Sequence, residues 1–141
     1  MIGLDTNVLV RYLTQDDPEQ AARANDLIEA CCTRHEPGRI CLVVLCELTW
    51  VLAGAYGYEK RLVVQVLEHI LAFRELSVEN EDIARSALAA FRRGKADYVD
   101  YVTVFPNRRA GCEATYSFDR KLARQTLYAC SRGVMFPCGN D

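Results

Sequence analysis

The sequence predicts a single α/β domain over residues 1–141, in which helices flank a parallel sheet. Short apolar runs alternate along the chain with segments of helical periodicity, as they do in α/β proteins. Half of the 141 residues are hydrophobic, which suits one compact domain with its own core. The sequence contains no internal repeat and no linker that would divide it.

The N-terminal part of the chain predicts one strand and two helices. The strand is expected over residues 1–4, and a turn with a short helix follows over residues 5–13. Asp17 and Pro18 mark the next helix start, because Asp caps free N–H groups and proline fits the first helical position. The apolar face of that helix consists of Ala21, Ala24, Leu27, Ile28 and Cys31.

The middle of the chain continues this alternation. A buried strand is expected over residues 40–44, followed by a helix that contains Glu47. A further helix is expected over residues 59–73, a third strand over residues 75–78, and another helix over residues 80–94.

The C-terminal part predicts a helix that begins near Asp97, a fourth strand over residues 112–116, a short helix after Asp119, and a fifth strand over residues 133–136. Pro106 falls inside the first of these helices. A proline there removes a backbone hydrogen bond and costs about 3 kcal/mol or more. We therefore expect the helix that follows Asp97 to be short or kinked.

The predicted strands are separated by helices, so they pair in parallel through right-handed crossovers. Ligand sites in such sheets lie at the carboxyl ends of the strands. Five acidic residues are expected at that edge: Asp5, Glu47, Asp97, Asp100 and Asp119. Each acid alone has an ordinary explanation as a turn residue or a helix cap. Their convergence is what predicts a functional site.

Glu47 is the hardest of these acids to explain by local structure. It is expected in the first turn of its helix, within a run that is otherwise almost wholly apolar. A carboxylate in such a run is expected to be partly buried, and it then needs a partner or a metal ion.

Several carboxylates that lie close together cannot all stay ionised without compensation. A divalent cation supplies that compensation, and an all-oxygen ligand set selects Mg²⁺, with Mn²⁺ as a substitute. Such a centre activates a water molecule for attack on phosphorus and stabilises the leaving oxygen.

Composition narrows the class of protein further. The seven cysteines are odd in number and show no zinc-site or redox spacing, which favours reduced thiols in a cytoplasmic protein. No segment approaches the roughly 18 apolar residues of a membrane span, and no signal-peptide pattern is found. The net charge of −2 argues weakly against a nucleic-acid partner, so the local distribution of basic residues matters more.

Four sequence motifs resemble those of the PIN-domain family. They are LDTNVLVRYL at residues 4–13, VLCELTWVL at 44–52, GKADYVD at 94–100 and TYSFDRK at 115–121. The likeness covers residues 1–122 in the expected order, and it fits best the VapC-type branch of ribonuclease toxins.

The resemblance implies a three-layer α/β fold with a doubly wound parallel sheet of strand order 3-2-1-4-5. It also implies Mg²⁺-dependent cleavage of RNA, a homodimer, and an antitoxin protein that covers the site. It implies a metal site formed by Asp5, Asp97, Asp100 and Asp119, with Glu47 as a further catalytic acid. It also implies supporting roles for Thr6, Asn7 and Ser117.

Basic residues are needed to hold RNA against such an acidic site. The candidates for phosphate contacts are Arg11, Lys95, Arg120 and Lys121. In the predicted reaction a metal-activated water attacks phosphorus in line, so the RNA 2′-OH is not needed as a nucleophile.

Two other functions stay open at this point. One is a PIN-fold module with little catalytic activity, which binds RNA or its antitoxin. The other is phosphotransfer through an aspartyl phosphate, which also places an Asp at the end of the first strand. That class usually shows a second acid close to the nucleophile, and Thr6 and Asn7 stand there instead.

Overall fold

The computed structural model describes residues 1–123. Within these residues, three short strands and seven helices alternate along the chain. Their order is β1 (Ile2–Gly3), α1 (Thr6–Thr14), α2 (Pro18–Cys31), β2 (Gly38–Ile40), α3 (Leu42–Gly54), α4 (Lys60–Ala72), β3 (Leu76–Val78), α5 (Glu81–Arg93), α6 (Tyr98–Arg109) and α7 (Arg120–Ala123). The predicted α/β class is therefore confirmed.

The three strands form one parallel sheet in the order β1-β2-β3. Gly38 of β2 pairs with Ile2 of β1 on one side and with Leu76 of β3 on the other. A Cβ atom on Gly38 would lie 2.7 Å from Leu4 Cδ1 and 2.8 Å from Cys32 Sγ, so only glycine lets α2 and the first strand approach so closely. The strand order matches the 3-2-1 portion of the expected sheet, and the complete five-stranded order remains a prediction.

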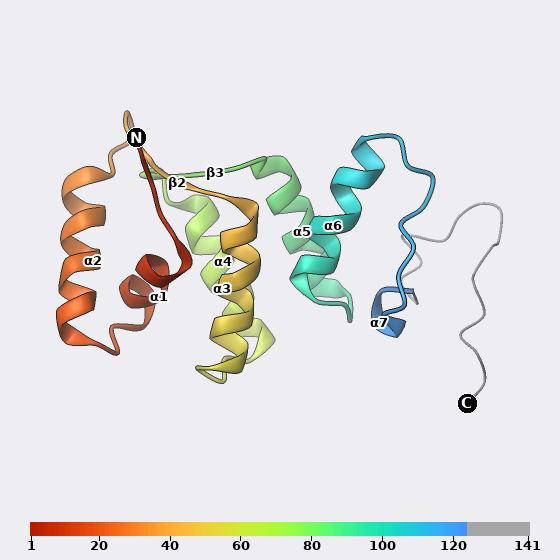
Figure 1. Cartoon of the computed structure of the whole chain (residues 1–141), viewed down its shortest axis with the longest axis horizontal. Coiled ribbons are helices and arrows are strands. Elements are labelled where there is room, and N and C mark those ends of the chain that lie inside the picture. The colour runs from red at the N-terminus through yellow and green to blue at the C-terminus, as the bar shows by residue number, and fades with distance from the viewer. Residues whose placement is uncertain (124–141) are drawn as a thin grey trace.

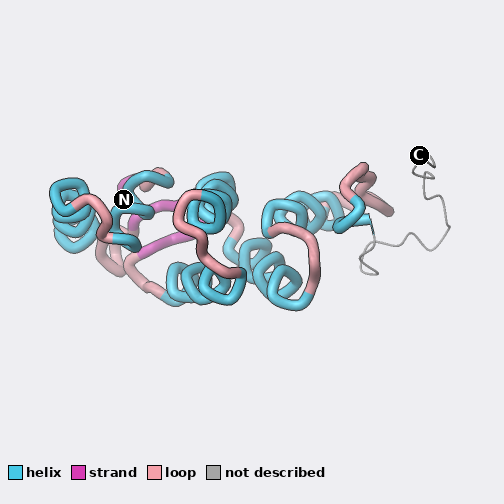
Figure 2. Tube along the Cα trace, turned by 90° about the horizontal axis from the view of Figure 1, so that it is seen from below, coloured by secondary structure: helices cyan, strands magenta, loops and turns pink. Residues whose placement is uncertain are grey.

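The helices are arranged side by side around and beyond this sheet (Figure 1). In Figure 2 the strands lie among α1 to α4, while α5 and α6 extend to one side. Helix α3 packs against α1, α4 and α6, and its Leu45, Leu48 and Leu52 are completely buried. None of the described helices has both the length and the apolar character needed to cross a lipid bilayer.

The fourth strand, expected over residues 112–116, is absent from the structure. This segment is irregular, and Gly111 before it turns the chain with a φ of +89°. Both Figure 1 and Figure 2 place the segment beyond α6, on the side away from the sheet, so it does not reach the free edge of β1. The segment contains polar Glu113 and Thr115, and its Tyr116 is exposed. The fifth predicted strand, residues 133–136, lies outside the described residues.

The second strand ends earlier than predicted, and α3 begins at Leu42 instead of after residue 44. Glu79, which follows β3, explains this difference. Its backbone N–H donates to Ile40 O at 2.8 Å, and its Oε2 accepts a hydrogen bond from the Leu42 N–H at 3.0 Å. A side chain from a distant part of the chain thus satisfies one of the free N–H groups at the start of α3.

Pro106 does not shorten α6, contrary to expectation, because the helix continues to Arg109. The proline stands in the last third of the helix, so the hydrogen bond that its missing N–H would form is lost only near the helix end. The carbonyl of Pro106 accepts from the Ala110 N–H at 2.9 Å, and the carbonyl of Asn107 accepts from the Cys112 N–H at 3.0 Å. These bonds satisfy carbonyl groups at the end of the helix.

Candidate functional site

Asp5 stands between β1 and α1 and serves as the N-cap of α1. Its backbone is extended, and its Oδ1 accepts a hydrogen bond from the Val8 N–H at 3.0 Å. This is the local capping role that any Asp before a helix can play. The side chain is exposed, so the cap also presents a carboxylate to solvent at the carboxyl end of the strand.

Glu47 is connected to this strand end through Thr6. The buried Thr6 hydroxyl donates a hydrogen bond to Glu47 Oε2 at 2.5 Å, although the two residues are 41 positions apart in sequence. Glu47 lies in the second turn of α3 and is exposed, so the expectation of a partly buried carboxylate in the first turn is wrong. Glu47 lies on the outer face of α3, whereas Leu45 and Leu48 face inward.

Asp97 and Asp100 lie together at the N-terminus of α6. Asp97 is the N-cap, and Asp100 Oδ2 accepts a hydrogen bond from the Asp97 N–H at 2.8 Å. This is the reciprocal half of a capping box, and it holds the Asp100 carboxylate against the helix start. Asp97 is exposed, whereas Asp100 is half-buried.

Asp119 approaches this pair from the C-terminal side, in the loop before α7. Its N–H donates to Ser117 Oγ at 2.9 Å, and its Oδ1 accepts from the Lys121 N–H at 2.7 Å. Ser117 thus fixes the backbone of the residue that carries the last acid. Both residues are exposed.

Electrostatics couple these three acids. Burial raises the pKa of Asp100, and the negative charges of Asp119 and Asp97 raise it further. The hydrogen bond from the Asp97 N–H and the charge of Lys121 act in the opposite direction. The Asp100 carboxylate therefore occupies a place where a negative charge is unfavourable unless a cation is near.

The structure thus presents the predicted acids as two groups. Asp5 and Glu47, which is bonded by Thr6, lie around β1 and α3. Asp97, Asp100 and Asp119 lie around the start of α6. Among residues 1–123, no three His, Cys, Asp or Glu side chains stand in an arrangement that could hold a metal ion. The donor set consists of carboxylate oxygens only, which is the chemistry that Mg²⁺ and Mn²⁺ prefer. Asn7 lies beside Asp5 as an exposed residue in the first turn of α1.

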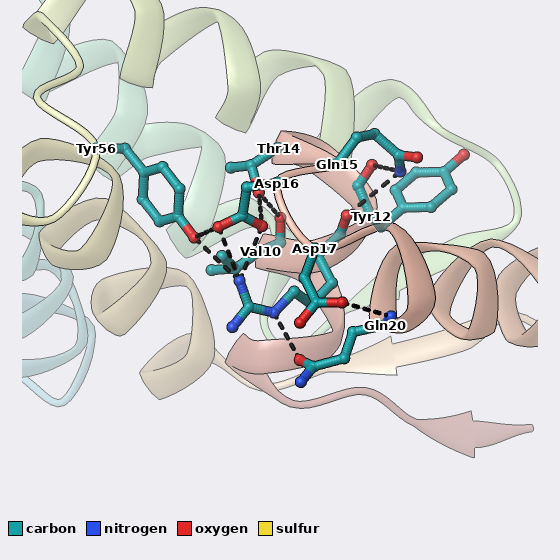
Figure 3. A network of polar contacts seen from close by, with 9 residues as sticks. Val10, Tyr12, Thr14, Gln15, Asp16, Asp17, Gln20 and Tyr56 are labelled. Atoms are coloured by element: carbon teal, nitrogen blue, oxygen red, sulfur yellow. Dashed lines mark hydrogen bonds and ion pairs between the residues drawn. The ribbon is translucent and has the colours of Figure 1, made fainter.

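Arg11, one of the predicted RNA contacts, is partly exposed, and its guanidinium belongs to a polar network with Asp16, Gln20 and Tyr56, which Figure 3 labels. Its Nη1 donates to Asp16 Oδ1 at 2.8 Å and to the Tyr56 hydroxyl at 3.3 Å, and its Nε donates to Gln20 Oε1 at 2.7 Å. The Tyr56 hydroxyl donates to Asp16 Oδ2 at 2.6 Å, and this bond, with those from Arg11 and Thr14, lowers the pKa of Asp16. The network connects α1, the turn before α2 and the turn after α3.

The other predicted RNA contacts lie near the acids of α6. Lys95 is exposed in the loop between α5 and α6, Arg120 begins α7, and Lys121 is exposed one residue later. Lys95 and Asp97 also line a groove together with Trp50, Tyr58 and Lys60, which sequence reasoning did not identify as a site. An exposed tryptophan on a helix is the one signal that could have indicated it, but exposure is not readable from the apolar run around Trp50.

Comparison with known proteins agrees with this arrangement of motifs. The model of the PIN domain family matches residues 2–126. A VapC ribonuclease from Aquifex aeolicus (strain VF5) is 23% identical over 121 residues, which cover 86% of this chain and 89% of that protein. No solved structure matches the chain at a significant level. Because the family match spans most of the sequence, including every acid discussed above, the chain belongs to the PIN-domain family.

Proposed function

We propose that the chain is an endoribonuclease of the VapC type, the toxin of a toxin–antitoxin pair, which hydrolyses RNA phosphodiester bonds with the help of a divalent cation. The PIN family and the likeness to a VapC ribonuclease support the reaction class. The observation that carries the proposal is the Asp100 carboxylate, whose pKa is raised by burial and by Asp119 and Asp97. A bound divalent cation is the partner that relieves such repulsion.

The ion would be held by Asp5, Asp97, Asp100 and Asp119. Mg²⁺ keeps several waters and binds few carboxylates directly, so a complete ring of protein ligands is not required. Mn²⁺ would serve as a substitute because it accepts the same oxygen donors. When bound, the ion supplies a water of lowered pKa and stabilises the leaving oxygen.

The remaining polar residues act on the water and on the acids. Glu47 and Asp97 would position the attacking water. Because the Thr6 hydroxyl occupies Glu47 Oε2, the second carboxylate oxygen is the one that would accept from this water. Ser117 holds the backbone of Asp119, and Asn7 would orient Asp5.

RNA would be held by phosphate contacts around α6 and α7, from Lys95, Arg120 and Lys121. Such contacts give affinity and salt dependence, but they do not select a sequence. Arg11 would contribute mainly by fixing the turn after α3, because its guanidinium already donates to Asp16, Gln20 and Tyr56.

The proposal includes a homodimer, a cognate antitoxin protein as the inhibitory partner, and action in the cytoplasm. These follow from the likeness to a VapC ribonuclease. A small antitoxin should be encoded by the neighbouring gene.

A second candidate function is a PIN-fold module that binds RNA or its antitoxin without cleaving. One observation favours it. The described residues contain no three acids that are already placed to hold a metal ion. The two candidates differ in whether RNA is cut.

The test is a cleavage assay on purified, partner-free protein with a mixture of structured RNAs, in Mg²⁺, in Mn²⁺ and in EDTA. We expect metal-dependent cleavage that is lost in Asp5→Asn and Asp100→Asn and retained in Glu19→Gln, an exposed acid of α2. Asn keeps the capping ability of Asp5, so loss of activity would not reflect loss of the helix start. RNA binding without cleavage in either metal would instead support the binding module, and a phosphate covalently bound to Asp5 would support phosphotransfer.

A further inference from the structure

A groove of about 470 Å³ runs between the C-terminal half of α3, the start of α4 and the loop that joins α5 to α6. Binding sites for small ligands commonly have volumes of about 300–1,000 Å³. The groove is therefore large enough for a single nucleotide, and its lining shows what kind of group it would accept.

The floor of the groove is apolar and firmly packed. Val63, Phe91 and Tyr98 line it and are almost completely buried. The rings of Phe91 and Tyr98 meet edge to face, with centroids 6.0 Å apart. These side chains belong to the packed core, so the floor does not have to rearrange when a ligand enters the groove.

Trp50 forms a side of the groove, and 55% of its surface is exposed. It is the only tryptophan in the chain. Leu45, Leu48 and Leu52 of α3 are buried in the core, whereas Trp50 lies on the outer side of the helix and leaves more than half of its surface accessible. An indole ring exposed beside a groove is well suited to stack on an unpaired base.

The turn after α3, which carries Tyr58, is connected to the polar network shown in Figure 3. Tyr58 lines the groove, and its ring meets that of Tyr56 edge to face at 6.4 Å. Tyr56 in turn donates to Asp16. The turn between α3 and α4 is thereby fixed before any ligand arrives, which reduces the entropy cost of binding.

Two lysines line the groove, together with the acidic Asp97. The Lys60 ammonium group lies 4.8 Å from the centroid of the Phe91 ring and donates to Gly94 O at 2.6 Å. Lys95 is exposed at the same rim. A rim with two ammonium groups above an aromatic floor matches the phosphate and the base of one nucleotide.

The groove is also continuous with the candidate catalytic site, because Asp97 lines the groove and neighbours Asp100 at the start of α6. A nucleotide in the groove would therefore lie next to the phosphate that is cut.

We propose that this groove binds one unpaired nucleotide of the RNA substrate, with its base stacked on Trp50 and its phosphate at Lys95 and Lys60. This inference rests on the proposed function and adds a specificity element to it, since the groove would require an unpaired base beside the cleavage point.

The test uses the fluorescence of Trp50 as a direct reporter of stacking. The full-length Asp5→Asn variant is used, because it should not cleave RNA and Asp5 does not line the groove. It is titrated in Mg²⁺ with a single-stranded oligoribonucleotide and with an abasic oligonucleotide of the same length. We expect the base-containing strand to quench the tryptophan and to bind about five- to tenfold more tightly than the abasic strand. A duplex RNA of the same sequence should give much less quenching.

Two variants separate the base contact from the phosphate contact, with RNA binding followed by a label on the RNA. Trp50→Ala should remove the preference for base-containing RNA, and the variant should fold because the Trp50 side chain is exposed. Lys95→Ala should lower the slope of log affinity against log salt concentration by about one unit. Arg23→Ala, which removes an exposed arginine of α2, is the matched control and should change neither quantity.

The proposal is overturned if RNA leaves the Trp50 fluorescence unchanged, or if Trp50→Ala keeps the full preference for unpaired bases. A response to polyglutamate of equal charge but not to RNA would also overturn it and would indicate an acidic protein segment as the occupant. Wild-type cleavage without quenching would reject only the groove, whereas quenching in a chain that never cleaves RNA would reject only the proposed reaction.

Discussion

The hydrogen bond from Thr6 to Glu47 joins the start of α1 to α3 and connects a supporting residue to a candidate catalytic acid. Its donor is buried and its acceptor is exposed. Thr6 therefore orients Glu47 without removing it from solvent. Breaking this bond should disturb the carboxylate's direction more than the stability of the fold, because a hydrogen bond with one exposed partner contributes only about 1 kcal/mol.

Thr6→Val tests this, because it replaces the hydroxyl by a methyl group of similar size. We expect RNA cleavage to fall about tenfold or more, as misplacement of a catalytic group costs this much, while the free energy of unfolding changes by about 1 kcal/mol or less. Thr6→Ser keeps the donor and should keep activity. Equal cleavage by the Val and Ser variants would show that Thr6 does not position Glu47.

The Asp100 carboxylate gives a second prediction, with a definite sign. Its pKa in the folded chain is raised from 3.8, so the native state holds the proton to higher pH than the unfolded state does. The carboxyl therefore contributes stability that is fully present below pH 3.8 and is lost as the pH rises through the raised pKa. Above that range, ionised Asp100 destabilises the metal-free fold.

Asp100→Asn should accordingly raise the thermal unfolding midpoint in EDTA at pH 7, because the amide carries no charge and still accepts from the Asp97 N–H. The gain should vanish below pH 3.8, where Asp100 itself is protonated. Circular dichroism melts at both pH values measure this difference. A lower midpoint for the variant at pH 7 would contradict a raised pKa of Asp100 in the folded chain.

Helices α3 and α6 show what the sequence could and could not specify about single elements. The sequence predicted a helix in each place, and Asp97, which it offered as a possible helix cap, is the N-cap of α6. The start of α3 was misplaced because the Leu42 N–H is bonded by Glu79, which lies 37 residues away. Local pattern carries no information about a cap supplied from another part of the chain.

Pro106 gives a testable prediction about helix α6. It stands inside α6 and cannot donate to the carbonyl one turn earlier, so the helix lacks one internal bond. Pro106→Ala should raise the free energy of unfolding by about 1–3 kcal/mol, since alanine restores the N–H and favours the helix. Urea unfolding measures the change. No gain, or a loss, would mean that this part of α6 is shaped around the proline.

At the scale of the whole molecule, the sequence predicted the first three strands better than the C-terminal part. Because helices separate strands 1 to 3, their parallel pairing followed from the pattern, whereas the order 3-2-1 was implied by the resemblance to the PIN-domain family. Residues 112–116 need the free edge of β1 to become a strand, and the chain carries them to the far side of α6 instead (Figure 1). Tertiary contacts override β propensity in such a segment.

Whether the predicted acids act together depends on how whole elements pack against one another. The structure shows Asp97, Asp100 and Asp119 as an electrostatically coupled group, and Glu47 as connected to the strand that precedes Asp5. The sequence could place each acid at the end of a strand or the start of a helix. It could not specify the distance between the two groups, because that distance depends on how α6 packs against α3.

The central claim is that acids from both groups hold one divalent cation. Electron paramagnetic resonance of Mn²⁺ added to the partner-free, full-length protein measures this directly, because bound and free Mn²⁺ give different spectra. We predict a saturable site whose affinity falls at least about tenfold in Asp5→Asn and equally in Asp100→Asn, while Glu19→Gln leaves it unchanged. Equal Mn²⁺ affinity in the wild type and in both Asn variants, or no saturable binding in the wild type, would contradict the claim.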